Sequence, residues 1–263
     1  MKNRLSRVAI VTGGASGIGK AVSLKLFEEG HSVVICDIDR EAAKSMEMKN
    51  AELGVEMLSQ YLDVSNSGRV KALFEKIYRK YGRIDILVHC AGTTSPASPL
   101  VKKTDNDFKR VIDVNLMGTF YCMRGAASYM IRGNFGRIIN IASRAGVFGL
   151  YGKCNYSASK AGMSGLSLTA AKELFEKGVT VNVIAPAGIR TAFSGQMPKK
   201  KDPRSRPDRV LGEPVDVAHL VSFLAKEESY LINGTVTVLD GGGSLWHGMD
   251  EKLWKVIRQT GSF

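Results

Sequence analysis

The chain has 263 residues, of which 44% are hydrophobic and 24% charged, and this usage excludes a disordered or low-complexity protein. It carries 37 Lys and Arg against 25 Asp and Glu, and the resulting net charge of +12 favours anionic ligands or partners. No apolar run approaches the roughly 18 residues of a membrane-spanning helix, and the four cysteines form no C-x-x-C pair. We therefore expect a cytoplasmic protein with reduced thiols and no membrane association.

Short β-branched runs alternate along the chain with longer stretches of helical period. We predict strands at 7–13, 32–37, 55–64, 84–92, 136–143, 179–186 and 235–242. We predict helices at 17–30, 40–54, 67–82, about 105–131, about 155–177 and after Pro214. This alternation predicts one α/β domain over residues 1–263, a doubly wound Rossmann fold with a seven-stranded parallel sheet.

A glycine turn, TGGASGIG, joins the first predicted strand to the first helix. Its glycines allow the backbone to approach a pyrophosphate, which would bind the positive end of the helix, although a purely structural turn uses the same residues. Asp37 ends the second strand 18 residues after Gly19, where an acid binds the adenosine ribose hydroxyls. A carboxylate there repels a 2′-phosphate, so we expect NAD, with NADP disfavoured. Ser16 agrees because it is not basic, and we interpret Arg40 as a solvated helix residue.

Tyr156 and Lys160 lie four residues apart at the start of a predicted helix and therefore point the same way. A free phenol has a pKa near about 10, and we expect the neighbouring ammonium to lower the pKa of Tyr156 so that it can transfer protons. Ser143 ends a strand 13 residues earlier. A tyrosine packed in the core beside a surface lysine would give the same spacing. The motifs elsewhere in the chain are therefore needed to decide between a catalytic and a structural pair.

The wider pattern of motifs resembles the short-chain dehydrogenase/reductase superfamily, over nearly the whole chain from Val8 to about Gly242. The matching motifs are the glycine turn, LDVS at Asp63, VNLMG around Asn115, the Ser143, Tyr156 and Lys160 set, APAGIRT and LDGG. The resemblance implies the catalytic residues Asn115, Ser143, Tyr156 and Lys160. It implies the cofactor-binding residues Gly13, Ser16, Gly17, Ile18, Gly19, Asp37, Asp63, Val64, Ala91, Gly92, Tyr156, Lys160, Ile189 and Thr191.

The chain departs from the family pattern at two places. The family usually has Asn-Asn-Ala-Gly after the fourth strand, whereas this chain has His89 and Cys90 before Ala91 and Gly92. We interpret His89 as a structural residue at a strand end, because no partner lies at metal-ligand spacing, and we expect no metal site. The second departure places Ala187 in a PAG sequence where the family has Pro-Gly.

The sequence offers candidates for the substrate lining and for a lid. Phe148, Leu150 and Tyr151 follow Ser143 and are candidate apolar lining, or ordinary loop residues. By resemblance, residues 192–212 form a lid over the substrate, and here this segment is strongly basic. Its charges would bind an anionic substrate group, or would simply keep a loop solvated. The candidate lid residues are Lys199, Lys200, Arg204 and Arg206.

We therefore expect an NAD-dependent oxidoreductase that interconverts a secondary alcohol and a ketone, on a hydroxyacyl-CoA or another anionic small molecule. A 3-oxoacyl-[acyl-carrier-protein] reductase-like enzyme, disfavoured by Asp37, and a polyol or sugar dehydrogenase remain alternatives. A nucleic-acid binder lacks an aromatic-interleaved basic surface, and the intact catalytic set disfavours a silent partner subunit. The resemblance implies a homo-oligomer, either a dimer or a tetramer. A C-terminal extension, residues 243–263, carries an apolar stripe that we expect to dock on its own or a neighbouring subunit.

Overall fold

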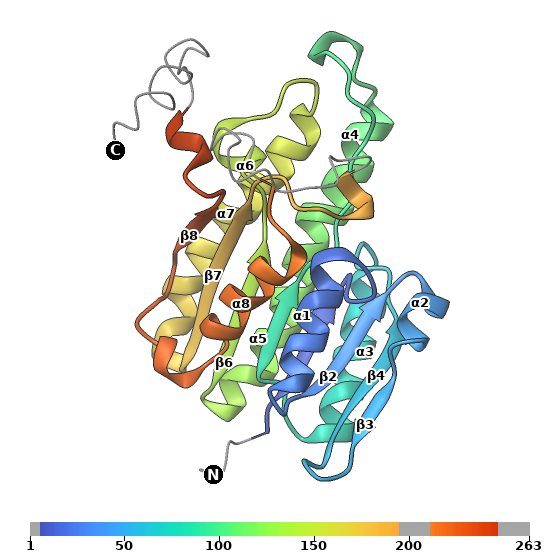
Figure 1. Ribbon diagram of the computed structural model, residues 1–263, viewed down its shortest axis with the longest axis vertical. Coiled ribbons are helices and arrows are strands. Elements are labelled where there is room, and N and C mark those ends of the chain that lie inside the picture. Colours follow the sequence, from blue (N-terminus) through green and yellow to red (C-terminus); the bar gives the residue numbers. More distant parts are fainter. Residues whose placement is uncertain (1–5, 195–210, 247–263) are drawn as a thin grey trace, which may run out of the picture.

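The computed structural model describes residues 6–194 and 211–246. Within this part of the chain, eight strands form one sheet in the order β3-β4-β2-β1-β5-β6-β7-β8 (Figure 1). All neighbouring strands are parallel except β3, which runs antiparallel to β4. The strands are β1 (Val8–Thr12), β2 (Ser32–Asp37), β3 (Met48–Asn50), β4 (Val55–Tyr61), β5 (Ile86–His89), β6 (Gly136–Ile141), β7 (Val179–Pro186) and β8 (Val236–Leu239).

Helices cover both faces of this sheet, as expected for a doubly wound fold. One apolar core joins the strands to α1 and α8, which lie in front of the sheet in Figure 1, and a second joins them to α3, α5 and α7 behind it. The helices are α1 (Gly17–Glu28), α2 (Arg40–Lys44), α3 (Ser67–Tyr81), α4 (Asp105–Ile112), α5 (Gly118–Met130), α6 (Ala145–Phe148), α7 (Cys154–Leu174) and α8 (Pro214–Leu224).

The central strands are apolar along their whole length because both of their faces are covered. Every residue of β1, β5, β6 and β7 is buried. Burial of continuous Val and Ile runs on both sides explains why these strands were predictable from short apolar stretches. The α/β architecture and the single parallel sheet core are therefore confirmed.

The predicted helix over 40–54 is wrong beyond Lys44, and the sheet has one strand more than we expected. Ser45 Oγ donates to the carbonyl of Ala42 at the end of α2. The chain then turns back, and β3 pairs antiparallel with β4 through Met48–Met57 and Asn50–Val55. The open edge of β4 offers backbone partners to this segment, and such partners outweigh its modest helix propensity.

The direction in which the strands are added reverses between β1 and β5. From β1 the sheet extends to β2 and β4 on one side, and to β5, β6 and β7 on the other. In an open α/β sheet, this reversal opens a crevice at the carboxyl ends of the two strands, which is where ligands bind. Among the described site residues, the glycine turn follows β1, and Ala91 and Gly92 follow β5.

Among the described residues, no helix is both long and apolar enough to cross a bilayer. All four cysteines lie in this part of the chain, and none forms a disulfide. Burial raises the pKa of the Cys90 thiol to about 12 and raises those of Cys36 and Cys122 as well. These thiols are therefore protonated and unreactive at neutral pH.

Candidate active site

The glycine turn between β1 and α1 leaves little room for side chains at Gly17 and Gly19. Gly17 has φ +49, and a Cβ on Gly19 would lie 2.0 Å from the carbonyl oxygen of Gly13. A Cβ on Gly17 would lie 3.0 Å from Thr191 Cγ2, so the loop after β7 reaches this turn. Ser16 precedes α1, but its side chain caps none of the helix N–H groups. The positive end of α1 is therefore left to an anionic ligand.

Asp37 lies beside the glycine turn, at the end of β2. Its Oδ2 accepts a hydrogen bond from the N–H of Ala15 at 3.0 Å, and its Oδ1 accepts one from the N–H of Asp39 at 3.1 Å. The Arg40 guanidinium lies 4.1 Å from the ring centroid of Tyr61, on the neighbouring strand. The carboxylate is thus fixed at the turn, while Arg40 is stacked on an aromatic ring.

Asp63 and Val64 follow β4 on the same edge. Asp63 Oδ1 accepts hydrogen bonds from the N–H and the hydroxyl of Ser65, at 3.0 and 2.7 Å, and Val64 is buried. After β5, the N–H of Ala91 donates to the Thr12 hydroxyl at 3.3 Å. The segment after β5 therefore contacts the glycine turn, while the Asp63 loop lies at the same edge of the sheet, two strands away from β1.

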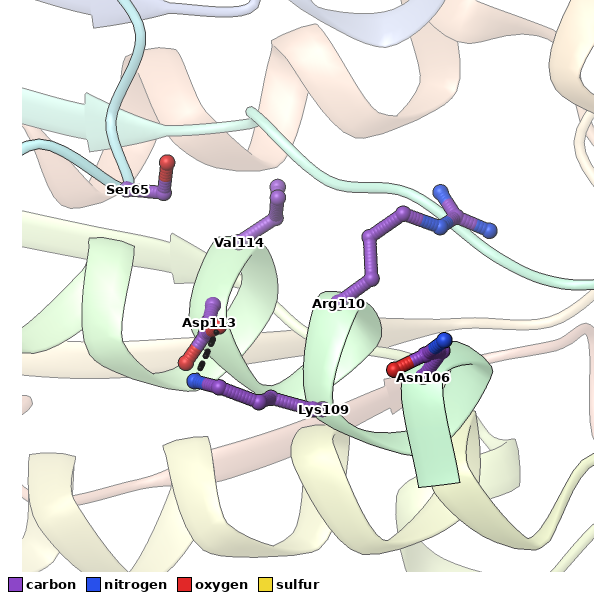
Figure 2. A pocket seen from close by; sticks show the side chains of 6 residues that line it. All are labelled: Ser65, Asn106, Lys109, Arg110, Asp113 and Val114. Atoms are coloured by element: carbon purple, nitrogen blue, oxygen red, sulfur yellow. Dashed lines mark hydrogen bonds and ion pairs between the residues drawn. The ribbon is translucent and has the colours of Figure 1, made fainter. Parts of the chain in front are cut away.

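A shallow hollow of about 260 Å³ lies between the loop after β4 and α4. Figure 2 shows Lys109 paired with Asp113 on one side of it, at 2.8 Å, and Arg110 extending away from that pair. Ser65, Asn106 and Val114 complete the lining. This hollow borders the Asp63 loop and contains none of the residues around Tyr156, so we assign it no part in the chemistry.

Asn115 lies in a π-helical turn (Asp113–Met117) between α4 and α5, and such turns are frequent at functional sites. It is fully buried, and its Oδ1 accepts from the N–H of Thr93 at 2.7 Å. Its Nδ2 donates to the Thr93 carbonyl at 2.9 Å and to Ser159 Oγ at 3.0 Å. The side chain therefore joins the loop after β5 to α7, the helix that carries Tyr156.

Ser143, Tyr156 and Lys160 meet at the carboxyl end of β6. Lys160 is buried, and its Nζ donates to the Ile141 carbonyl at 2.7 Å and lies 5.9 Å from the ring centroid of Tyr156. A Cβ on Gly92 would lie 3.6 Å from Lys160 Nζ and 3.3 Å from Asn115 Oδ1. The four residues predicted to be catalytic therefore surround one point, which the wall at Gly92 also borders.

The expected lowering of the Tyr156 pKa is not found in this structure. Burial raises the pKa of the phenol, and the Ser143 hydroxyl offsets only part of that effect. Burial also lowers the pKa of Lys160 to about 8. The reason is that removal from water penalises the charged form of each group, and the ammonium of Lys160 is turned toward the Ile141 carbonyl.

His89 ends β5 and is completely buried. Its Nδ1 lies 2.9 Å from Thr12 Oγ1, and burial, assisted by the charge of Lys160, lowers its pKa to about 3. A neutral, hydrogen-bonded imidazole at this position links β1 to β5. This geometry supports a structural role for His89.

The candidate substrate residues are placed less clearly than the catalytic ones. Phe148 and Leu150 are each 53% exposed and Tyr151 is 90% exposed, so in this structure they lie at the surface and not in an enclosed pocket. Lys199, Lys200, Arg204 and Arg206, most of the predicted lid, and the stripe in the C-terminal extension lie outside the described residues. Phe193, at the described start of the predicted lid, was not predicted as a site residue, although its ring centroid lies 6.2 Å from that of Tyr156.

The residues present fit a dinucleotide. A cradle closed by glycines, an uncapped helix N-terminus and a fixed carboxylate on the next strand match the pyrophosphate and ribose ends of such a molecule. Its reactive end would then lie toward Tyr156 and Lys160. Ile189, which is buried, and Thr191 lie on the loop between these two ends.

Comparison with known proteins agrees with this geometry. Residues 7–202 match the family model described as short chain dehydrogenase. The chain belongs to the short-chain dehydrogenase family. It is therefore a member of a family of oxidoreductases that use nicotinamide cofactors.

Three curated relatives are each 39% identical to the chain. The first is the 3-oxoacyl-[acyl-carrier-protein] reductase FabG of Thermotoga maritima, and the match covers 90% of this chain and 97% of the relative. The second is the (2S)-[(R)-hydroxy(phenyl)methyl]succinyl-CoA dehydrogenase subunit BbsD of Thauera aromatica, with coverages of 92% and 98%. The third is the human (3R)-3-hydroxyacyl-CoA dehydrogenase, with coverages of 92% and 97%. The crystal structure of levodione reductase superposes with a TM-score of 0.83 at 29% identity, covering 92% of this chain and 99% of that one. This short-chain dehydrogenase thus shares its fold with that structure over 92% of its length.

Proposed function

We propose that this short-chain dehydrogenase is an NAD-dependent enzyme that interconverts a secondary alcohol and a ketone on an anionic, 3-hydroxyacyl-type substrate. The observation that carries the reaction type is the convergence of Ser143, Tyr156, Lys160 and Asn115 beside the glycine cradle. The observation that favours NAD is the carboxylate of Asp37, which is fixed at the same cradle.

A bound nicotinamide cofactor would supply the hydride acceptor or donor. In the oxidative direction, we assign Tyr156 as the base that takes the hydroxyl proton, and Ser143 as the group that hydrogen-bonds the substrate oxygen. The charge of Lys160 would stabilise the Tyr156 phenolate. It would therefore lower the pKa of Tyr156, against the effect of burial. Asn115 holds the loop after β5 against α7 and so positions the other three.

The choice of substrate class rests on the relatives and on charge. The relatives' names concern 3-oxoacyl, 3-hydroxyacyl and hydroxy-substituted succinyl groups, each carried on coenzyme A or an acyl carrier protein. The chain's net charge of +12 suits such anionic molecules. We extend this shared substrate chemistry to the chain and assign the oxygen at C3 of an acyl group as the reacting one.

The choice of cofactor is supported by two neighbours of the ribose position. A carboxylate there would accept hydrogen bonds from both hydroxyls of the adenosine ribose, and it would repel a 2′-phosphate. Arg40, the cation that could offset this repulsion, is stacked on Tyr61. We therefore disfavour NADP as the cofactor, and with it the 3-oxoacyl-[acyl-carrier-protein] reductase alternative.

Steady-state kinetics with 3-hydroxybutyryl-CoA and either NAD⁺ or NADP⁺ test this proposal. We expect kcat/KM to be at least about 10-fold higher with NAD⁺, because hydrogen bonds to a charged group contribute about 1.5–3 kcal/mol. Asp37→Ser should lower that preference by at least about 10-fold, while Asp39→Ser, a neighbouring carboxylate that caps α2, should keep it. A wild-type preference for NADP⁺ would refute the cofactor assignment, and no turnover of any hydroxyacyl substrate would refute the substrate class.

A further inference from the structure

Two lysine side chains converge on the loop that follows β5. Lys103 Nζ donates to Ser95 Oγ at 3.2 Å, to the Pro96 carbonyl at 2.9 Å and to the Gly152 carbonyl at 3.4 Å. Lys153 Nζ donates to Thr94 Oγ1 at 3.2 Å and to the carbonyl of Ser95. Both ammonium groups therefore contact the same buried residue, Ser95, although Lys103 precedes α4 and Lys153 precedes α7.

This cluster carries more positive charge than its surroundings neutralise. Arg110 joins it through hydrogen bonds to Thr93 Oγ1 and the Thr94 carbonyl, both at 3.0 Å, and its guanidinium lies 3.8 Å from Asp107. Over residues 6–194 and 211–246, neither Lys103 nor Lys153 has a carboxylate within ion-pair distance. Burial, and then the charge of Lys103, lowers the pKa of Lys153. Two like charges that contact the same residue, Ser95, favour an anion between or beside them.

The cluster is tied directly to the catalytic residues. Lys153 is the residue before α7, whose first turn carries Tyr156. Asn155 Nδ2 donates to Ser95 Oγ at 2.9 Å, and the N–H of Thr93 donates to Asn115 at 2.7 Å. The loop that the lysines hold is therefore the continuation of the Gly92 wall that borders Lys160.

We propose that Lys103 and Lys153 bind a carboxylate of the substrate itself, a few bonds from the carbon that is oxidised. This inference rests on the proposed function and narrows it to 3-hydroxy acids, or to hydroxyacyl thioesters that carry a second, free carboxyl group. The phosphates of coenzyme A are separated from the reacting carbon by the long pantetheine arm. They are therefore too distant from that carbon to occupy an anion site beside the first turn of α7, which carries Tyr156.

The test compares ligands that differ only in this charge. The probes are 3-hydroxybutyrate, its neutral methyl ester and 3-hydroxybutyryl-CoA, each titrated calorimetrically into the enzyme saturated with NAD⁺ and each assayed for NADH formation. The variants are Lys103→Gln and Lys153→Gln, which keep a polar donor but lose the charge, and Lys153→Arg, which keeps the charge. Lys109→Gln is the control, because Lys109 is exposed on α4 and paired with Asp113.

We expect wild-type enzyme and Lys109→Gln to bind 3-hydroxybutyrate at least about 10-fold more tightly than the ester, which corresponds to about 1.4 kcal/mol. Each Gln variant should lose most of this difference, while Kd and KM for the ester and the CoA thioester stay within about twofold. Lys153→Arg should restore at least part of the discrimination.

Two results would overturn the carboxylate site. The first is wild-type enzyme that does not distinguish the acid from the ester, and the second is Gln variants that weaken the ester equally, which would show that the lysines only hold the loop. If the ester and thioester are oxidised in either case, the proposed function stands without the site. Conversely, lysine-dependent binding of the acid with no NADH formed from any probe would support the site and refute the proposed reaction.

Discussion

Tyr156 and Lys160 show how burial acts on a proton-transfer pair. Burial raises the pKa of the Tyr156 phenol and lowers the pKa of the Lys160 ammonium to about 8. Both shifts favour the uncharged form of the side chain. Lys160 Nζ lies 5.9 Å from the ring centroid of Tyr156. The four-residue spacing correctly predicted that Tyr156 and Lys160 are neighbours. It could not predict the desolvation that opposes the expected lowering of the Tyr156 pKa.

Tyr156→Phe removes the hydroxyl that we assign to proton transfer and leaves the ring. We expect kcat to fall by about 10²–10⁴-fold, the usual contribution of general acid–base catalysis, with the free energy of unfolding changed by less than about 1 kcal/mol. Tyr230→Phe, at an exposed tyrosine after α8, provides the matched control and should keep full activity. Turnover in Tyr156→Phe within about twofold of wild type would eliminate the assignment.

His89 gives a pH dependence whose sign follows from its burial. Its pKa is about 3 in the folded state, against about 6.5 for an ordinary histidine, so the unfolded chain takes up the proton first as the pH falls. The resulting stability is fully present above about pH 6.5 and is lost between about pH 6.5 and 3.

His89→Asn removes this titration and keeps a polar group that can reach Thr12. Between about pH 7 and 4.5, we expect the wild type to lose about 2–3 kcal/mol more unfolding free energy than the variant does. Urea unfolding at the two pH values measures the difference, in which the contributions of the other titrating groups cancel. Parallel losses in both proteins would show that His89 does not carry this dependence.

Among the elements, those buried on both sides were predictable and those at an open edge were not. Ile86–His89 and Val179–Pro186 are continuous apolar runs, and the structure forms strands there. The segment after Lys44 has the residues of a helix but lies beside the open edge of β4, which pairs with it as β3. A single sequence does not show which edge will be free, so a tertiary contact decided this element.

The same distinction holds for the candidate site. Tyr156 and Lys160 share one helix, and Ser143 follows a strand, so local spacing brings them together in any fold of this type. Phe193, Lys103 and Lys153 reach the site through irregular loops, whose paths no period in the sequence describes. Lys153 could have been noticed as a charge three residues before Tyr156, but its partner Lys103 is 50 positions away.

At the level of the strand–turn–helix element, Gly19 should not tolerate a side chain. A Cβ there would lie 2.0 Å from the Gly13 carbonyl oxygen, so Gly19→Ala must open the turn that forms the cradle. We expect a loss of at least about 2 kcal/mol in unfolding free energy, since overpacking costs about 1–3 kcal/mol, and at least a 10-fold weaker Kd for NAD⁺.

Gly68→Ala is the matched control, because Gly68 lies in the first turn of α3, is exposed, and its added Cβ would make only one contact, at 3.4 Å. This variant should be neutral or more stable by up to about 1 kcal/mol and should bind NAD⁺ normally. Equal behaviour of the two variants in urea unfolding and NAD⁺ titration would contradict the close approach in the cradle.

The glycine cradle and the four candidate catalytic residues lie at the same edge of the sheet. The reversal of strand order between β1 and β5 separates the cradle beside β2 from the catalytic residues beside β6. Asn115 and the loop after β5 lie between them, and their hydrogen bonds join α7 to the centre of the sheet. A ligand that spans both halves would therefore contact most of the elements that hold the carboxyl edge together, and its binding should stabilise the entire fold.

This coupling leads to a prediction for the intact protein. A ligand that binds only the folded state at 100 times its Kd adds about 2.7 kcal/mol of stability, which for a chain of this size raises Tm by roughly 5–10 °C. We expect this shift with NAD⁺ and a shift smaller by at least about half with NADP⁺ at the same concentration, because Asp37 opposes the 2′-phosphate.

Thermal unfolding with each cofactor, in wild type and in Asp37→Ser, separates this effect from general anion binding to a chain of net charge +12. General binding would stabilise both proteins more with NADP⁺, the more highly charged cofactor, and would disappear as salt is raised through the screening range. If Asp37 recognises the cofactor, NAD⁺ should instead stabilise the wild type more than NADP⁺ does, at low and at high salt. This preference for NAD⁺ should be absent in Asp37→Ser. A salt-sensitive preference for NADP⁺ in the wild type would show that net charge, and not the carboxylate at the end of β2, selects the cofactor.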